Sequence, residues 1–167
     1  MGIVERDFDC EEIHPIDIVE TLAEERSWDF DRVAEDQIAM AVEGTWKTYS
    51  VTLAWSAQDE SLRLICAFDM APPRKRLGAL YKSMALANER CWSGAFTLWT
   101  DQKVMAYRYG LNLAGGAIAS STQINDMVHD AVLACERFYP AFQLVAWGGE
   151  APEKALGIAM TEAYGRA

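Results

Sequence analysis

The stretch Gly94–Gly110 reads GAFTLWTDQKVMAYRYG, and it decides the fold because it separates a core face from an open face. Two alternating runs flank Asp101-Gln102, a pattern typical of a β-hairpin. Any loop with an even number of residues places Trp99 opposite Val104 and keeps the same residues on each face. One face then carries Phe96, Leu98, Met105, Tyr107 and Tyr109, and the other carries Ala95, Thr97, Trp99, Val104, Ala106 and Arg108. The first set predicts a core layer beneath helices, so most of these aromatic residues need no ligand to explain them.

Three earlier runs alternate in the same way and predict an antiparallel meander. They are Ile38–Val42, Tyr49–Trp55 and Leu62–Phe68. The second face of these strands is small and weakly polar, and it carries Ala39, Ala41, Thr48, Ser50, Thr52, Ala54, Ile65 and Ala67. Small side chains let another layer approach closely. Three layers are candidates: the chain's own Phe142–Trp147 segment, a second subunit, or a bound polypeptide.

Helical patterns surround these strands. The first helix is expected from Pro15 to about Arg26. The second follows Pro72-Pro73, and one stripe of it carries Leu77, Leu80, Tyr81, Met84, Asn88, Cys91 and Trp92. The third begins near Ser120, is expected to kink at Pro140 and ends before Gly148-Gly149. A short last helix is expected from Pro152 to about Tyr164.

The order of elements is therefore α-β-β-β-α-β-β-α, followed by a short C-terminal helix. We predict an α+β fold in which helices pack on one face of a five-stranded antiparallel sheet. Residues 1–14 are expected to form an N-terminal tail, and residues 15–167 a single domain that includes the last helix.

Charge and composition exclude several classes of function. The 167 residues include 25 acidic and 15 basic side chains, a net charge of -10, which opposes binding to nucleic acid or to an anionic membrane. No apolar run approaches the ~20 residues of a membrane span, and the N-terminus lacks a secretory signal. The four cysteines form no C-x-x-C pair and are expected to be reduced, as in a cytoplasmic protein.

No pattern of catalytic or metal-ligating residues stands out. Cys10, Glu11, Glu12 and His14 are crowded together, but they have no second pair at ligand spacing, so we interpret them as a solvated entry to the first helix. His129 falls on the solvent side of the third helix, without a nucleophile placed for it. Phosphate-binding loops are absent. We therefore expect no cofactor, no metal and no enzymatic activity.

Three residues on helices break the expected pattern. Asn88 lies in the apolar stripe of the second helix, where its amide must find partners; we interpret it as a structural polar residue that bonds to backbone at the helix-to-strand junction. Leu86 and Leu133 point away from the stripes of their helices. Together they indicate a candidate surface for a partner, as do Trp99 and Arg108 on the sheet, because Trp and Arg are enriched at binding hot spots.

Several segments carry a resemblance to a known family. They are CAFDMAPPRKR, LANERCWSGAFTLW, ERFYPAFQLVAWGG and APEKALGIAM, and the likeness covers roughly residues 15–165. These segments resemble the YbjN domain family of bacterial sensory transduction regulators. The resemblance implies a fold like that of type III secretion chaperones, which are small, acidic, usually dimeric and bind polypeptides. The family has no assigned catalytic residues to carry over, and a shared fold does not establish function.

Two functions follow from these observations. The first is a non-enzymatic, cytoplasmic protein-interaction or chaperone-like regulatory protein that acts as a homodimer and binds a polypeptide partner. The alternative is a small-molecule sensor or enzyme. Its pocket would lie between helices and sheet near Asn88, Tyr107 and Arg108, with Trp99 or Trp92 as a wall.

Overall fold

The computed structural model describes residues 13–164 as an antiparallel sheet covered by helices. In this part of the chain the sheet has six strands in the order β1-β2-β3-β4-β6-β5. They are β1 (Asp29–Ala34), β2 (Gln37–Glu43), β3 (Thr48–Ser56), β4 (Ser61–Asp69), β5 (Gly94–Trp99) and β6 (Val104–Asn112). The α+β class and the antiparallel sheet are as predicted, whereas the predicted number of five strands is wrong.

Strand β1 is the one that the sequence pattern did not reveal. It forms one edge of the sheet and pairs with β2, so that Phe30 lies opposite Met40. Most of its side chains are exposed, and three of the six residues in its sequence DFDRVA are charged: Asp29, Asp31 and Arg32. An edge strand needs little burial of its own, and charges on it oppose association with another sheet. Hydrophobic alternation is therefore too weak there to predict the strand.

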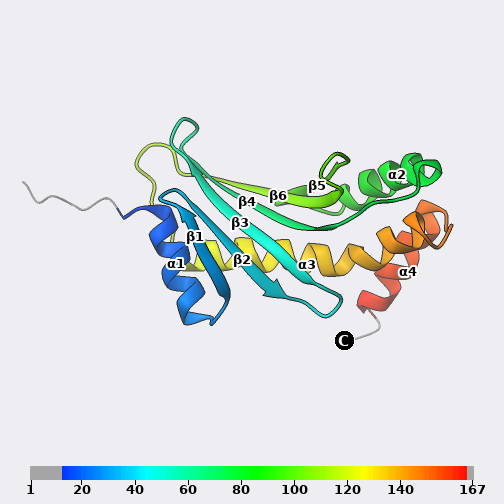
Figure 1. Ribbon diagram of the computed structural model, residues 1–167, viewed down its shortest axis with the longest axis horizontal. Helices are drawn as coiled ribbons and strands as arrows, with labels where there is room; N and C mark the ends of the chain where they lie inside the picture. Colours follow the sequence, from blue (N-terminus) through cyan, green and yellow to red (C-terminus); the bar gives the residue numbers. More distant parts are fainter. Residues whose placement is uncertain (1–12, 165–167) are drawn as a thin grey trace, which may run out of the picture.

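The described helices all lie on one side of the sheet, with α3 running behind the strands in Figure 1. They are α1 (Pro15–Glu25), α2 (Leu77–Asn88), α3 (Ser121–Ala146) and α4 (Pro152–Tyr164), and a short 3-10 turn, η1 (Arg74–Arg76), precedes α2. Helix α3 begins with a capping box, in which Ser120 and Gln123 bond to each other's backbone N–H groups. It continues through Pro140 to Ala146.

Aromatic side chains from the strands and from α3 form the centre of the core. Phe96 on β5 meets Phe138 and Phe142 of α3 at ring-centroid distances of 5.7 and 5.1 Å. Phe68 on β4 lies against Tyr139 at 5.2 Å. These contacts place the inner face of the sheet, as assigned from the hairpin, directly under α3.

Two cysteines belong to the same core. Cys66 of β4 and Cys135 of α3 are fully buried, with their Sγ atoms 3.6 Å apart. The contact with the Cys66 thiol, together with burial, raises the pKa of Cys135. The Cys135 thiol therefore stays protonated.

A carboxylate on α3 holds the β2–β3 hairpin in place. Glu136 accepts hydrogen bonds from the backbone N–H groups of Thr45 and Trp46, at 2.9 and 3.1 Å. It also accepts one from the Tyr49 hydroxyl at 2.5 Å. A Cβ atom on Gly44 would collide with this carboxylate and would lie 2.6 Å from the Tyr49 ring. The glycine is therefore required by the close approach of helix and turn.

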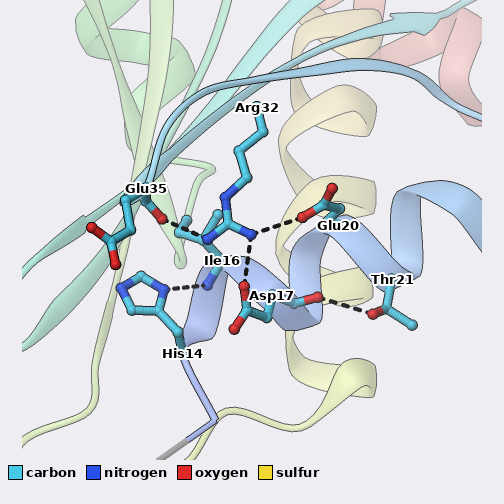
Figure 2. Close-up of polar contacts among 7 residues, drawn as sticks. All are labelled: His14, Ile16, Asp17, Glu20, Thr21, Arg32 and Glu35. Atoms are coloured by element: carbon cyan, nitrogen blue, oxygen red, sulfur yellow. Dashed lines mark hydrogen bonds and ion pairs between the residues drawn. The ribbon is translucent and has the colours of Figure 1, made fainter.

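A second polar cluster joins the edge strand β1 to helix α1 (Figure 2). The Arg32 guanidinium donates to the carboxylates of Asp17 and Glu20, at 2.6 and 2.8 Å, and to the backbone carbonyl of Glu35 at 2.6 Å. At the start of the same helix, His14 Nδ1 accepts from the Ile16 N–H. The strand that lacks a strong hydrophobic pattern is thus fastened by ion pairs.

Candidate functional site

The candidate site is the outer face of the sheet, the face turned away from the helices. Strand pairing aligns its side chains in rows across the strands. One row is Ala39, Thr52, Ile65, Arg108 and Ala95, and the next is Ala41, Ser50, Ala67, Ala106 and Thr97. Trp99 lies opposite Val104, as the even-loop argument predicts. The small character of this face therefore extends across five strands.

A groove of about 670 Å³ crosses the outer face over β4, β6 and β5. We call it the sheet groove; its lining includes Arg63, Ile65, Ala95, Thr97, Trp99 and Arg108. Trp99 is half-buried and Arg108 is exposed. The structure thus brings together the two sheet residues that were predicted as binding candidates.

The sheet groove carries positively charged side chains, whereas the whole chain has a negative net charge. Arg63 forms an ion pair with Asp59, whereas Arg108 has no ion pair with any residue from 13 to 161. The chain as a whole carries a net charge of -10. Two arginines beside a tryptophan and an isoleucine therefore favour a ligand with both acidic and apolar groups.

The chain's own Phe142–Trp147 segment does not cover this face. Phe142 is fully buried against Phe68 and Phe96, which are inner-face residues. Helix α4 packs against α3 and α2. Of the three layers considered for the outer face, this segment is thereby excluded.

Asn88 makes the structural contacts that its position predicts. Its Oδ1 accepts from the Phe96 N–H at 2.7 Å, and its Nδ2 donates to the Phe96 carbonyl at 3.1 Å. Phe96 lies on β5, the edge of the sheet opposite β1. The amide therefore occupies backbone groups that a neighbouring strand would otherwise use, and it is not available to a ligand.

The two leucines differ in exposure. Leu86 is partly buried and packs against the core, so the expectation that it points away from the core is wrong. Leu133 is 56% exposed, as expected.

The alternative pocket is assembled only in part: Tyr107 and Trp92 line one cavity beside α3, whereas Arg108 and Trp99 line the sheet groove on the other face. Tyr107 is buried on the inner face while Arg108 is exposed on the outer face, so the two cannot line one cavity between helices and sheet. Trp92 was expected on the stripe of α2, but the helix ends at Asn88 and Trp92 is 99% exposed in the following loop. The prediction failed because the Asn88 bonds to β5 end the helix before its hydrophobic spacing does.

The described residues hold no group of three or more side chains suited to a metal ion. Cys10, Glu11 and Glu12 lie outside the described residues. His129 is exposed, in a shallow depression that Leu133 and Glu136 also line. None of the helices in residues 13–164 is long and apolar enough to cross a membrane.

Comparison with known proteins agrees with this architecture. Residues 15–144 match the family model described as "YbjN: Putative bacterial sensory transduction regulator". A search of curated proteins finds no match. Two solved structures share the fold at TM-scores of 0.53. One is YbjN of E. coli, a putative transcription regulator, at 7% identity over 74% of this chain and 90% of that one. The other is a chain of the HopA1–SchA chaperone–effector complex, at 12% identity over 77% of this chain and 94% of that one. The family match spans most of the sequence, and the chain therefore belongs to the YbjN family.

Proposed function

We propose that this protein is a non-enzymatic, cytoplasmic regulator or chaperone-like module that acts as a homodimer. In this proposal, it binds a polypeptide partner in the sheet groove. The fold is shared with a chain of a chaperone–effector complex, and the family is one of regulators. Both support a protein-binding role.

One observation carries the proposal. All the described helices lie on one side of the sheet, which leaves the sheet groove open with Trp99 half-buried and Arg108 exposed. Trp and Arg supply much of the energy at protein interfaces, because they combine apolar area with directed hydrogen bonds. The groove crosses three neighbouring strands, β4, β6 and β5, as suits an extended peptide.

The test is cross-linking of the tagged protein in its own host, followed by mass spectrometry. The double variant Trp99→Ala/Arg108→Glu is compared with the wild-type chain. We expect the partner to be recovered at least about tenfold less with the variant, since truncating a hot spot costs roughly 2 kcal/mol or more.

A matched control changes the same residue types away from the groove, as Trp46→Ala/Arg74→Glu, and should recover the partner as the wild type does. Equal recovery by both variants contradicts the proposal. Light scattering of the same proteins reports the dimer. If the groove variant alone becomes monomeric, the groove is the subunit interface and not the partner site.

A further inference from the structure

A second feature lies on the helical side of the molecule, between the α2–β5 loop and α3. It is a cavity of about 210 Å³, here called the Arg137 cavity, and its lining includes Arg90, Trp92, Ser93, Asp130, Leu133 and Arg137. Ligand pockets for whole small molecules are usually about 300–1,000 Å³. The cavity is below that range, and its size suits a single side chain better than a metabolite.

Arg137 is the unusual residue in this cavity. Its Nε is buried and has no hydrogen-bond partner, and it is the only side-chain N or O atom of that kind among the residues described. Its Nη2 donates to the Met160 sulfur at 2.9 Å, a weak acceptor, and its Cζ lies 5.3 Å from the centre of the Phe138 ring. No carboxylate of residues 13–161 pairs with it. A half-buried guanidinium with an unsatisfied Nε and no counter-ion among these residues is costly to keep, which points to a ligand that supplies one.

Asp130, the one acidic residue among those that line the cavity, does not satisfy Arg137. It precedes Arg137 by seven residues, about 10.5 Å along the helix at 1.5 Å per residue. An incoming carboxylate is attracted to the Arg137 end and repelled from the Asp130 end. Arg90 adds a second guanidinium on the loop, where one of its N–H groups is already bonded to the Leu86 carbonyl. The cavity is therefore polarised, with its cationic part at Arg137 and Arg90.

The rim of the same cavity is apolar. Trp92 is 99% exposed, the most exposed large apolar side chain among the described residues, and Leu133 is 56% exposed. Leaving an indole fully in water forgoes about 25 cal/mol for each Å² of apolar surface that could be buried. An exposed tryptophan beside two arginines that form no ion pair with residues 13–161 is the composition of an interface hot spot.

We propose that the Arg137 cavity binds an acidic side chain of a polypeptide partner. The carboxylate pairs with Arg137 and Arg90, and an adjacent apolar residue packs on Trp92 and Leu133. This inference rests on the proposed polypeptide-binding function and adds a second, chemically defined contact to it. The occupant is specified by charge complementarity: the cavity is cationic in a chain whose net charge is -10.

The test is panning of a random peptide library, displayed on phage, against three forms of the full chain. These are the wild type, the cavity variant Arg137→Met and the groove variant Trp99→Ala/Arg108→Glu. We expect the wild type and the groove variant to enrich a class of peptides in which Asp or Glu adjoins a large apolar residue. We expect Arg137→Met to lose that class by tenfold or more.

The outcomes separate the two proposals. If the enriched peptides bind the wild type and Arg137→Met equally, the proposal that the Arg137 cavity binds an acidic side chain is wrong. The proposed polypeptide-binding function is then unaffected. If none of the three forms enriches peptides, both the proposed function and the proposal for the Arg137 cavity are wrong. Methionine is close to arginine in its apolar length, and it removes a half-buried guanidinium whose Nε has no hydrogen-bond partner among the residues described. The melting temperature of Arg137→Met should therefore be equal to or above that of the wild type. A clear fall would show that the guanidinium is structural and would overturn the proposal.

A final comparison distinguishes a peptide from a free anion. An enriched peptide, its Asp→Asn or Glu→Gln version and sodium acetate are each titrated into isotope-labelled protein, and the Arg137 Nε–H resonance is followed. The acidic peptide is expected to shift it, and the amide version is not. If acetate alone shifts the resonance at the same concentration as the peptide, the cavity is a small-anion site and the polypeptide assignment is wrong.

Discussion

The Asn88 side chain bonds to the edge of the sheet where a further strand could otherwise pair. Its amide bonds to both backbone groups of Phe96 on the edge strand β5. Native sheets protect their edges because unpaired N–H and C=O groups recruit other chains. We expect Asn88→Ala to lower the free energy of unfolding by about 1–3 kcal/mol, since it leaves two polar groups without partners. It should also promote self-association through the freed edge.

Chemical denaturation and light scattering check this prediction. The matched control is Asn125→Ala, on α3, where the half-buried amide makes no hydrogen bond to the described residues. The control should remain within about 0.5 kcal/mol of the wild type and keep its assembly state. Equal stability of the two variants would show that water replaces the Asn88 amide at no cost.

Gly44 decides whether the β2–β3 hairpin can reach α3. A Cβ atom there would meet the Glu136 carboxylate and the Tyr49 ring. We expect Gly44→Ala to destabilise the fold by about 1–3 kcal/mol, because either the turn or the helix must move. Gly78→Ala is the matched control: its Cβ meets nothing within 4 Å on α2, and alanine should stabilise the helix by up to about 1 kcal/mol. Denaturant unfolding of both variants distinguishes steric crowding from a general effect of alanine.

At the scale of elements, the edge strand β1 depends on Arg32 for its attachment to α1 (Figure 2). The bonds to Asp17 and Glu20 raise the pKa of Arg32, so the guanidinium stays charged at any working pH. We expect Arg32→Gln to increase amide hydrogen exchange over residues 29–34 by several-fold, with little change in β3 and β4. Arg26→Gln, which alters an exposed arginine just past the end of α1, serves as the control.

Salt provides a second check on the same attachment. Screening weakens exposed ion pairs, so exchange in wild-type β1 should rise toward that of Arg32→Gln at about 1 M salt. Exchange in β1 that is indifferent to both the substitution and salt would mean that Phe30 and the pairing with β2 hold the strand alone.

At the scale of the whole molecule, stability should fall in alkali. Burial raises the pKa of Tyr107 to about 12. Burial and the hydrogen bond to Glu136 raise the pKa of Tyr49 above its ordinary value of 10.0. Between the unfolded and the folded pKa, the folded state keeps a proton that the unfolded state has lost. The two tyrosines therefore contribute fully to the free energy of unfolding below about pH 9–10. As the pH rises further, this contribution decreases by up to about 1.4 kcal/mol per pH unit for each tyrosine.

Unfolding in denaturant at a series of pH values from 8 to 12 measures this slope. Tyr49→Phe should make the slope shallower, because it removes one of the protons involved. Tyr81→Phe, which changes an exposed tyrosine, should leave the slope as it is. A stability that does not change up to pH 12 would contradict the buried, protonated state of both tyrosines.

The sequence by itself determined which side of each central strand is core, because side chains alternate along a strand with a period of two. Phe96 and Tyr107 could therefore be assigned to the core, and Trp99 and Arg108 to the opposite face. Asn88 could be assigned to a backbone contact, because a polar amide in an apolar stripe must find partners.

Only the tertiary structure decided the rest. It added β1, which is held by ion pairs with the preceding helix α1, and it placed Trp92 in solvent because α2 ends at Asn88. It also left the Nε of Arg137 buried without a hydrogen-bond partner among the residues described. The periodicity of hydrophobic residues indicates whether a residue lies on the buried or the exposed side of its own helix or strand. Whether a charge meets a partner depends on segments that only the folded chain brings together.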